Sequence, residues 1–326
     1  GEGEFDPIVY KTWPQIYFAG KKLQKSSHIS PYQYKMVQGL EFYEHYLKKL
    51  NGYQNISFLQ EEVKYISETE EGALVHTSNA SYEGKQVFNS IFDYRSLKKD
   101  SGYPILQQHF LGWFVKTEHP IFESDKATFM DFSIAQKGNT RFMYVLPFSE
   151  TEALVEYTLF SEKPLEQKEY EDAIQKYLID KKSGSYEITG TEQGNVPMTC
   201  YDFTGHNSEH VFYIGMAGGW AKASTGYTFR KSQKNVKLLV EHLKNGKKAI
   251  AFKTKSRFWF YDLLLLDILH KDNHLGQSIF ESLFKNRKPQ LILKFLDEGT
   301  SFFEDVYIMM APKPWPFIKS LLGRLF

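Results

Sequence analysis

Four strand-like segments follow one another in the middle of the chain, and they constrain the fold more than any other feature. They are residues 108–117, 127–135, 141–148 and 153–160. The breaks at 137–139 (Lys-Gly-Asn) and 149–152 (Ser-Glu-Thr-Glu) are short enough for hairpins, which join antiparallel neighbours. The segment therefore predicts an antiparallel sheet, followed by a charged helix over 165–181 and one more strand at 186–190.

The last of the four strands carries a glutamate within an apolar sequence. Because side chains alternate along a strand, Glu156 shares its face with Leu154 and Thr158. A carboxyl group among apolar neighbours has its charged form disfavoured, which raises its pKa and suits it to proton donation near neutral pH. A solvated face of a half-exposed sheet explains the same pattern at least as well.

An acidic residue also interrupts the strand predicted at 127–135. Asp131 lies in the apolar sequence FMDFS, residues 129–133. If its strand is adjacent to that of Glu156, the two carboxyl groups can share one face. Like charges held close make one of the pair keep its proton, which suits acid chemistry. Asp131 is therefore predicted as the partner of Glu156.

A glycine-rich segment follows a short strand predicted at 211–216. A strand, a glycine-rich turn and a helix start can bring backbone N–H groups against a phosphate, and glycine allows a ligand to approach closely. Thr225 and Gly226 are expected at the N-terminus of the next helix, whose dipole favours an anionic or electron-rich partner such as a pyrophosphate or a flavin ring. A tight turn that binds nothing has the same pattern.

The rest of the chain is predicted as shorter elements. A helix is expected over 31–50, three short strands at 56–66, 73–77 and 86–92, and helices from residue 258 onward. The longest apolar run, 258–269, contains Asp262 and Asp267 and is much shorter than the ~20 apolar residues of a membrane span. It is interpreted as a buried helix.

The C-terminal stretch 316–326 combines large apolar side chains with Lys319 and Arg324, directly after Trp315. This composition is typical of a helix that lies in a membrane interface. A helix docked on the protein's own core explains it nearly as well.

Charge, cysteine and histidine content bear on the class of protein. Forty basic and 39 acidic residues leave a net charge of +1, so no overall field attracts nucleic acid. The single cysteine, Cys200, cannot form an internal disulfide, which fits a reducing cytoplasm. The histidine pairs 206/210 and 270/274 have neither a third nearby ligand nor the HExxH glutamate, so no metal site is predicted. No nucleophile elbow, P-loop or kinase signature is present.

Several of these segments resemble one family. FMYVLPFSETEALVEYTLFS, residues 142–161, resembles the hairpin motif of bacterial lycopene cyclases, in which a VLP turn precedes a glutamate strand. GMAGGWAKASTGYTFRKS, residues 215–232, resembles the family's later flavin-contacting segment. FMDFS is similar to the strand with its other acidic position, and QQHFLGWFVKTEHPIF, residues 107–122, to the preceding strand. The resemblance extends from Trp13 through the helical tail.

The resemblance implies an α/β fold of the FAD-dependent flavoprotein type (Rossmann-like, GR2-type), with an antiparallel substrate-binding sheet and a helical C-terminal region. It divides the chain into the remainder of an FAD-binding domain (1–106), the substrate sheet (107–190), a return to the FAD-binding domain (191–250) and the helical region (251–326). The family opens with a β-α-β unit bearing a GxGxxG fingerprint, which this sequence lacks. We therefore expect the chain to start just after that unit.

The implied activity is that of a lycopene β-cyclase, which closes the ψ-ends of lycopene into β-ionone rings and gives β-carotene without net redox change. Glu156 is expected to act as the acid with Asp131 as its partner. Reduced FAD, with NAD(P)H as its reductant, is expected to supply negative charge or a proton beside the carbocation. The residues expected to contact the flavin are Gly215, Ala217, Gly218, Gly219, Thr225, Gly226 and Tyr227.

The substrate also implies a location, because lycopene dissolves in bilayers: we expect a peripheral position on the cytoplasmic side of the inner membrane. Many relatives carry a second acid directly after the glutamate, where this chain has Tyr157.

Two other functions stay open. They are an FAD-dependent isoprenoid oxidoreductase or monooxygenase of the same fold, and a polyene-binding protein without catalysis.

Overall fold

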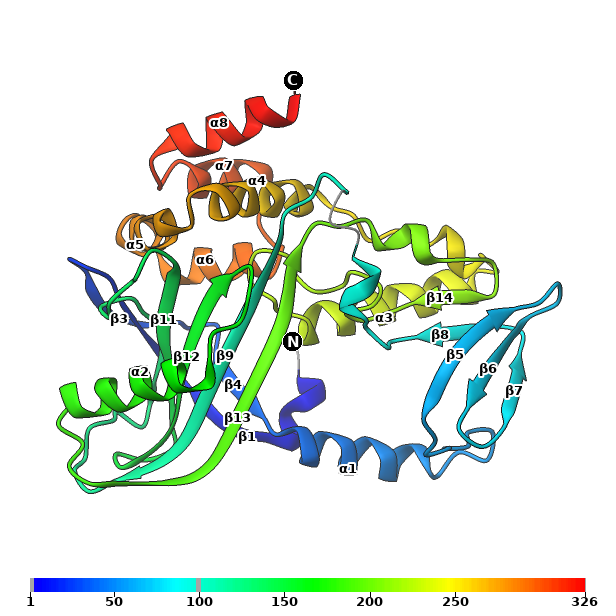
Figure 1. The fold of residues 1–326 in the computed structure, drawn as a ribbon, viewed down its shortest axis with the longest axis horizontal. Coiled ribbons are helices and arrows are strands. Elements are labelled where there is room, and N and C mark those ends of the chain that lie inside the picture. The colour runs from blue at the N-terminus through cyan, green and yellow to red at the C-terminus, as the bar shows by residue number, and fades with distance from the viewer. Residues whose placement is uncertain (1–2, 98–100, 326) are drawn as a thin grey trace. The chain divides into compact units, whose positions relative to one another are not determined.

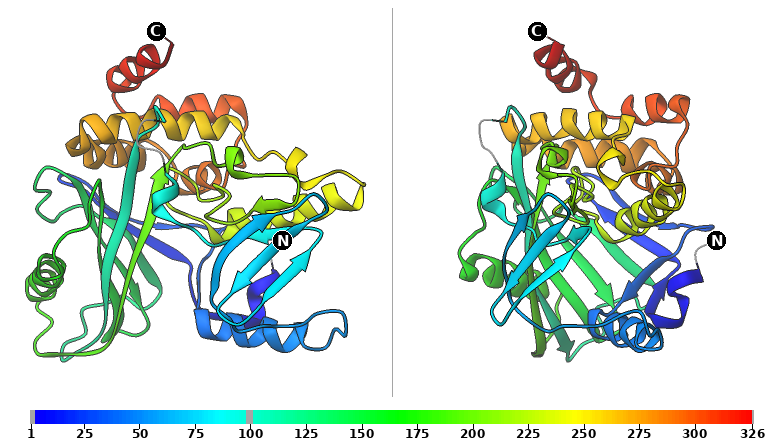
Figure 2. Two further views of the ribbon diagram at one scale, coloured as in Figure 1. Left: turned by 45° about the vertical axis from the view of Figure 1, so that its right-hand side comes forward. Right: turned by 90° about the vertical axis from the view of Figure 1, so that its right-hand side faces the viewer.

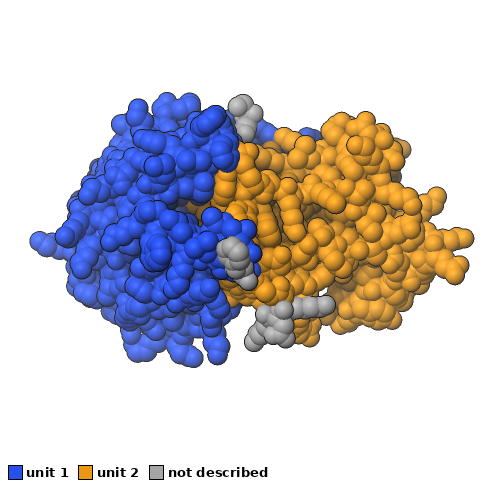
Figure 3. All heavy atoms as spheres, turned by 90° about the horizontal axis from the view of Figure 1, so that it is seen from above, with its two compact units in different colours: residues 1–49, 106–196, 267–326 blue, residues 50–105, 197–266 orange. Residues whose placement is uncertain are grey.

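The computed structural model describes residues 3–97 and 101–325. The chain forms two compact units, coloured separately in Figure 3. Unit 1 contains residues 1–49, 106–196 and 267–326, and unit 2 contains residues 50–105 and 197–266. The first 49 residues and residues 267–326 therefore belong to the same compact unit as most of the predicted substrate sheet. The four-part division by function stays a prediction.

A seven-stranded sheet forms the centre of unit 1, in the order β13-β9-β12-β11-β10-β2-β3 (Figure 1). Its strands are β2 (Gln15–Ala19), β3 (Gln24–His28), β9 (Ile105–Thr117), β10 (Lys126–Asp131), β11 (Thr140–Pro147), β12 (Glu152–Ser161) and β13 (Tyr186–Thr199). The run from β9 to β10 is antiparallel, whereas β10 pairs with β2 in parallel. The four predicted strands and both hairpins are confirmed.

The two faces of this sheet are covered differently. Helix α2 (Gln167–Asp180) packs on one face through Tyr170, Ile174, Tyr177 and Leu178 (Figure 2). On the other face, Leu146 and Leu154 pack with Trp13, at the end of β1 (Val9–Trp13). Strand β1 pairs with β4 (Tyr34–Val37), so the helix predicted from residue 31 begins only at Gly39, as α1 (Gly39–Leu50).

Helices fill the end of the chain, as predicted. They are α4 (Arg257–Lys271), α5 (Gly276–Asn286), α6 (Pro289–Leu296), α7 (Phe302–Met309) and α8 (Pro314–Leu325). Proline begins both α6 and α8, where its missing N–H costs nothing. Among the described residues, the structure has no helix that is long and apolar enough to cross a membrane.

Unit 2 combines a small sheet with a strand, turn and helix. Strands β5 (Val63–Glu68), β6 (Ala73–Thr77) and β7 (Ser81–Gly84) form an antiparallel sheet, and β8 (Val87–Asn89) pairs in parallel with β14 (Val211–Tyr213). Helix α3 (Phe229–Lys244) follows and buries Leu239 against Phe212 and Trp220.

Five short 3₁₀ helices, from both units, complete the described elements: Gly3–Ile8, Tyr94–Ser96, Phe203–His206, Ala249–Ala251 and Asn273–Leu275.

Candidate active site

Glu156 lies in the middle of β12, between two neighbouring strands. Its register partners are Tyr144 on β11 and Gly112 on β9. The residue is only 7% exposed, and its face-sharing neighbours Leu154 and Thr158 are buried as well. The predicted alternation is therefore confirmed, and the solvated-face alternative is excluded.

The glycine opposite Glu156 leaves room for the glutamate arm. A Cβ at position 112 would stand 2.8 Å from Cγ of Glu156 and 3.3 Å from Cγ of Glu192 on β13. Real Cβ atoms essentially never approach a neighbour within 3.0 Å. The side chains of Glu156 on β12 and Glu192 on β13, the two neighbours of β9, therefore both pack over Gly112.

Glu156 and Glu192 form a hydrogen-bonded carboxyl pair. Burial raises the pKa of Glu156 well above its ordinary value, and the charge of Glu192 and the hydrogen bond between them raise it further. Burial also raises the pKa of Glu192, whereas the hydrogen bond from Glu156 lowers it. Burial thus favours a protonated carboxyl group in this pair, most of all at the more deeply buried Glu156.

Aromatic rings flank the carboxyl pair, and glycines on β13 make room for them. A Cβ at position 194 would stand 2.5 Å from the ring of Phe110, and one at position 190 would stand 3.4 Å from the ring of Phe114. Phe110 and Phe114 lie on β9 two residues before and after Gly112, so they share its face. The pair therefore lies on a largely apolar surface.

Asp131 does not join this pair. Strand β11 lies between β10 and β12, so the strands of the two acids are not adjacent. The side chain of Asp131 points to the face covered by α2, where its Oδ2 accepts a hydrogen bond of 3.0 Å from the Tyr177 hydroxyl and its Oδ1 accepts two from Ser133. The prediction that Asp131 shares a face with Glu156 is wrong, because the strand order separates them and the sheet lies between their side chains.

Glu192 was missed because the predicted strand ended at Gly190, whereas β13 continues to Thr199. Glycine is depleted in strands, and residues 190–194 contain two of them. The available signal was the alternation Gly190, Glu192, Gly194, which places the glutamate and two small residues on one face.

The glycine-rich segment forms the predicted strand, turn and helix within unit 2. After β14, Gly215, Gly219 and Gly226 have positive φ angles of 57°, 70° and 69°, which glycine adopts without strain. Gly218 packs so closely that a Cβ there would stand 2.3 Å from the Tyr213 carbonyl oxygen. Helix α3 begins at Phe229, three residues after Gly226.

An ion pair fixes the same turn from inside unit 2. Lys222 is buried, and its Nζ donates to both carboxylate oxygens of Asp262, at 2.9 and 3.0 Å. The ion pair therefore holds Lys222, in the middle of the segment predicted to contact the flavin, against Asp262 of α4.

The turn and the first part of α3 have features that fit a polar ligand such as FAD. A Cβ at Gly215 would meet no atom within 4 Å, so the backbone there is open to close approach. On α3, the Oγ of Ser232 and the Nδ2 of Asn235 are buried without a hydrogen-bond partner among the described residues. These two residues are three apart and share one side of the helix. Buried polar groups normally have a partner, so a bound ligand can supply it. Of the other predicted contacts, Ala217 is buried and Tyr227 exposed.

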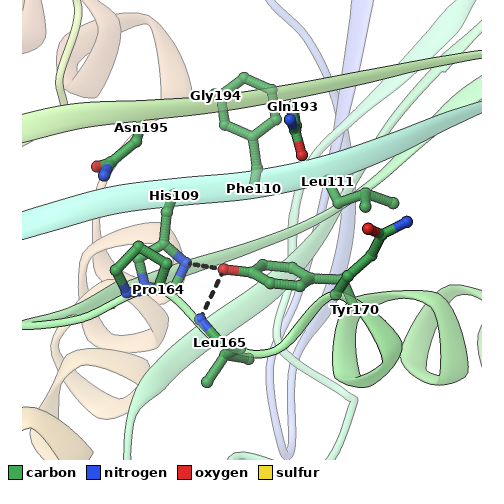
Figure 4. A pocket seen from close by; sticks show the side chains of 10 residues that line it. His109, Phe110, Leu111, Pro164, Leu165, Tyr170, Gln193, Gly194 and Asn195 are labelled. Carbon is green, nitrogen blue, oxygen red and sulfur yellow. Dashed lines mark hydrogen bonds between the residues drawn. The ribbon is translucent and has the colours of Figure 1, made fainter.

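A pocket of about 390 Å³ lies beside α2, and His109 is part of its lining (Figure 4). Ser161 Oγ donates its proton to the Lys163 carbonyl oxygen and therefore accepts a hydrogen bond from His109 Nε2. Since the other nitrogen of a neutral imidazole is an acceptor, His109 Nδ1 accepts from the Tyr170 hydroxyl at 2.7 Å, and Tyr170 Oη in turn accepts from the Leu165 N–H. Burial, with a smaller effect of Arg141, lowers the pKa of His109 to about 4. This histidine is neutral and has a structural role.

Comparison with solved structures identifies the fold. A geranylgeranyl bacteriochlorophyll reductase-like protein from Thermoplasma acidophilum superposes with a TM-score of 0.56 at 11% identity, over 97% of this chain and 84% of its own. The flavin-dependent brominase Bmp2 gives 0.51 at 13% identity (99% and 84%), and the halogenase PltM, in complex with phloroglucinol and FAD, gives 0.51 at 11% (93% and 71%). At such identities the likeness concerns the fold alone, and it confirms the predicted α/β flavoprotein fold.

Comparison at the level of sequence identifies the family. No curated protein matches the chain. The family model described as "Lycopene cyclase protein" matches residues 2–322, nearly the whole chain. The chain therefore belongs to the lycopene cyclase family.

Proposed function

We propose that this protein is a lycopene β-cyclase in which Glu156 is the acid. The observation that supports it most is the buried carboxyl group of Glu156 on an apolar, aromatic face, where burial raises its pKa well above the ordinary value. Such a group can protonate an alkene, which is a very weak base, only where water does not compete for the proton. A linear polyene is a substrate of matching polarity, because it offers no polar group to this surface.

The reaction needs one proton and returns one proton. The Glu156 carboxyl gives its proton to the terminal double bond of a ψ-end, forming a C–H bond and a carbocation. The internal double bond attacks this cation and forms the ring C–C bond, after which the ring loses a proton and becomes a β-ionone ring. No electrons are gained or lost. The rings of Phe110 and Phe114 beside Glu156 provide π-faces that stabilise a cation.

We propose FAD as the cofactor, with NAD(P)H as its reductant. The residues that would hold it are the predicted set Gly215, Ala217, Gly218, Gly219, Thr225, Gly226 and Tyr227, joined by Ser232 and Asn235. In its reduced form, FAD would supply negative charge to the reaction. Charge that is fixed in place before the reaction is usually the largest contribution to catalysis.

We also propose that α7 and α8 bind a membrane surface from which lycopene is drawn. Helix α8 is held by its polar side, because Arg324 and Ser320 bind the buried Asp267 of α4. Its apolar residues point outward instead: Trp315 is 69% exposed and Leu325 is 65% exposed. On α7, Phe303 is 84% exposed. Outward aromatic and aliphatic side chains beside Lys319 favour the interface of an anionic bilayer.

Pigment analysis tests the proposal. The protein is expressed in cells that accumulate lycopene, and the pigments are separated by chromatography. We expect β-carotene from the unchanged protein and from Glu150→Gln, a matched change at an exposed glutamate in the same hairpin, but only lycopene from Glu156→Gln. Lycopene alone from folded, FAD-loaded, unchanged protein would refute the cyclase. Consumption of NAD(P)H or oxygen in proportion to product would favour an oxidoreductase of the same fold.

A further inference from the structure

The two carboxyl groups above Gly112 are not equivalent. Glu156 lies on a central strand, and its side chain is almost completely buried. Glu192 lies on β13, the edge strand of the sheet, and is only partly buried. The edge position leaves Glu192 with more contact to solvent, so Glu192 is the member of the pair that carries a negative charge at lower cost.

The sheet holds Glu192 in this position through packing. Ring contacts at Gly190 and Gly194 fix β13 against β9, and Thr189 donates a side-chain hydrogen bond of 3.2 Å to the Phe114 carbonyl. The arm of Glu192 is thereby brought over Gly112, where it meets the arm of Glu156.

Two of the other polar side chains on this face, those of Tyr144 and Lys116, have partners other than the carboxyl pair. Tyr144, opposite Glu156 on β11, shares a hydrogen bond of 2.7 Å with Tyr34. At the end of the face, Lys116 pairs with Glu152 at 3.5 Å. Among the charged side chains, Glu192 is the one whose charge raises the pKa of Glu156.

We propose that Glu192 is a positioning residue of the acid site: its carboxylate accepts the hydrogen bond of Glu156, keeps that carboxyl protonated and fixes its direction above Gly112. The inference rests on the proposed function for its catalytic meaning. The pair itself can be measured without turnover. Once Glu156 has given up its proton, two carboxylates stand together beside the cation, which favours the return of a proton to the pair at the end of the reaction.

Infrared titration of the folded protein tests the pair directly. The C=O stretching band of a protonated carboxyl group, present at neutral pH and absent in Glu156→Gln, is followed as the pH is raised. In Glu192→Gln the negative charge is gone and the new amide can donate to a Glu156 carboxylate. Both changes favour the ionised form, so we expect the band to disappear at a pH lower by about one unit or more.

The matched control is Glu187→Gln, an exposed glutamate on the same strand, which should leave the titration unchanged. The pH dependence of β-carotene formation gives a second result. In Glu192→Gln, the pH at which activity is lost on the alkaline side should be lower by the same amount as the pH at which the infrared band disappears. A band that titrates identically in Glu192→Gln and the unchanged protein would overturn the proposal. Absence of β-carotene at every pH, with the band shifted as expected, would refute the cyclase function and leave the pair established.

Discussion

The hydroxyl of Tyr177 donates a hydrogen bond to the Asp131 carboxylate at 3.0 Å, and this bond ties α2 to β10. Both side chains are buried. Burial and the Asp131 charge raise the pKa of Tyr177 well above its ordinary value, so the tyrosine keeps its proton and remains the donor. Asp131, the second acid suggested by the family resemblance, therefore connects the sheet to α2.

Asp131→Asn should consequently lower stability. An Asn at this position offers one carbonyl oxygen for the two oxygens that now accept from Tyr177 and Ser133, and loss of a hydrogen bond to a charged group costs about 1.5 to 3 kcal/mol. Urea unfolding measures the free energy of unfolding. Tyr177→Phe should cost a similar amount, and the double variant less than the sum. Full stability of Asp131→Asn together with loss of cyclisation would contradict the structural role.

The sequence predicted the sheet well because its signals are local. Alternation along 153–160 located Glu156, and short polar breaks located both hairpins. The position of Asp131 depends on strand order and on an irregularity of β10 between Thr128 and Asp131, and neither is visible in one strand's sequence. Glu192 depends on ring packing across strands: Gly194, which weakens β13 as an isolated strand, is required because a Cβ there would stand 2.5 Å from the ring of Phe110 on β9.

Gly112→Ala should damage the acid site while the sheet persists. The added methyl group would stand 2.8 Å from Cγ of Glu156 and 3.3 Å from Cγ of Glu192, so the two arms must move apart. We expect at least about a tenfold loss of β-carotene formation, since small displacements of reacting groups are costly. Gly190→Ala is the control, because its methyl group meets Phe114 at an ordinary 3.4 Å. Equal activity of the two variants would count against the crowding above Gly112.

The buried ion pair of Lys222 and Asp262 gives a prediction for unit 2. Lys222→Met leaves the Asp262 carboxylate buried without its cation, which typically costs about 3 to 5 kcal/mol. The double variant Lys222→Met with Asp262→Leu should recover much of the loss. Denaturant unfolding of the three variants provides the measurement, and FAD content should follow the same order. A double variant as unstable as Lys222→Met would show that the pair is not the source of the loss.

His109 predicts a dependence of stability on pH. Its pKa is about 4 in the folded protein and near 6.5 when unfolded, so above pH 6.5 both states are neutral and nothing is contributed. As the pH falls from 6.5 to 4, only the unfolded state takes up the proton, and stability should fall by up to about 3 kcal/mol. Unfolding of His109→Gln over this range should show a flatter dependence. Identical slopes for both proteins would refute the buried neutral histidine.

The outward apolar side of α7 and α8 predicts binding to membranes. Leu325→Glu and Phe303→Glu each place a charge where we expect contact with the bilayer interface, so co-flotation with anionic liposomes should fall several-fold. Neither change should reduce stability, because both side chains are already largely exposed. Leu40→Glu, at a position of α1 that is 72% exposed, is the matched control and should float like the unchanged protein. Turnover should fall with lycopene in liposomes but not with lycopene dispersed in detergent, since only the first route needs the surface. Undiminished flotation of both variants would refute the assignment of α7 and α8 as the membrane contact.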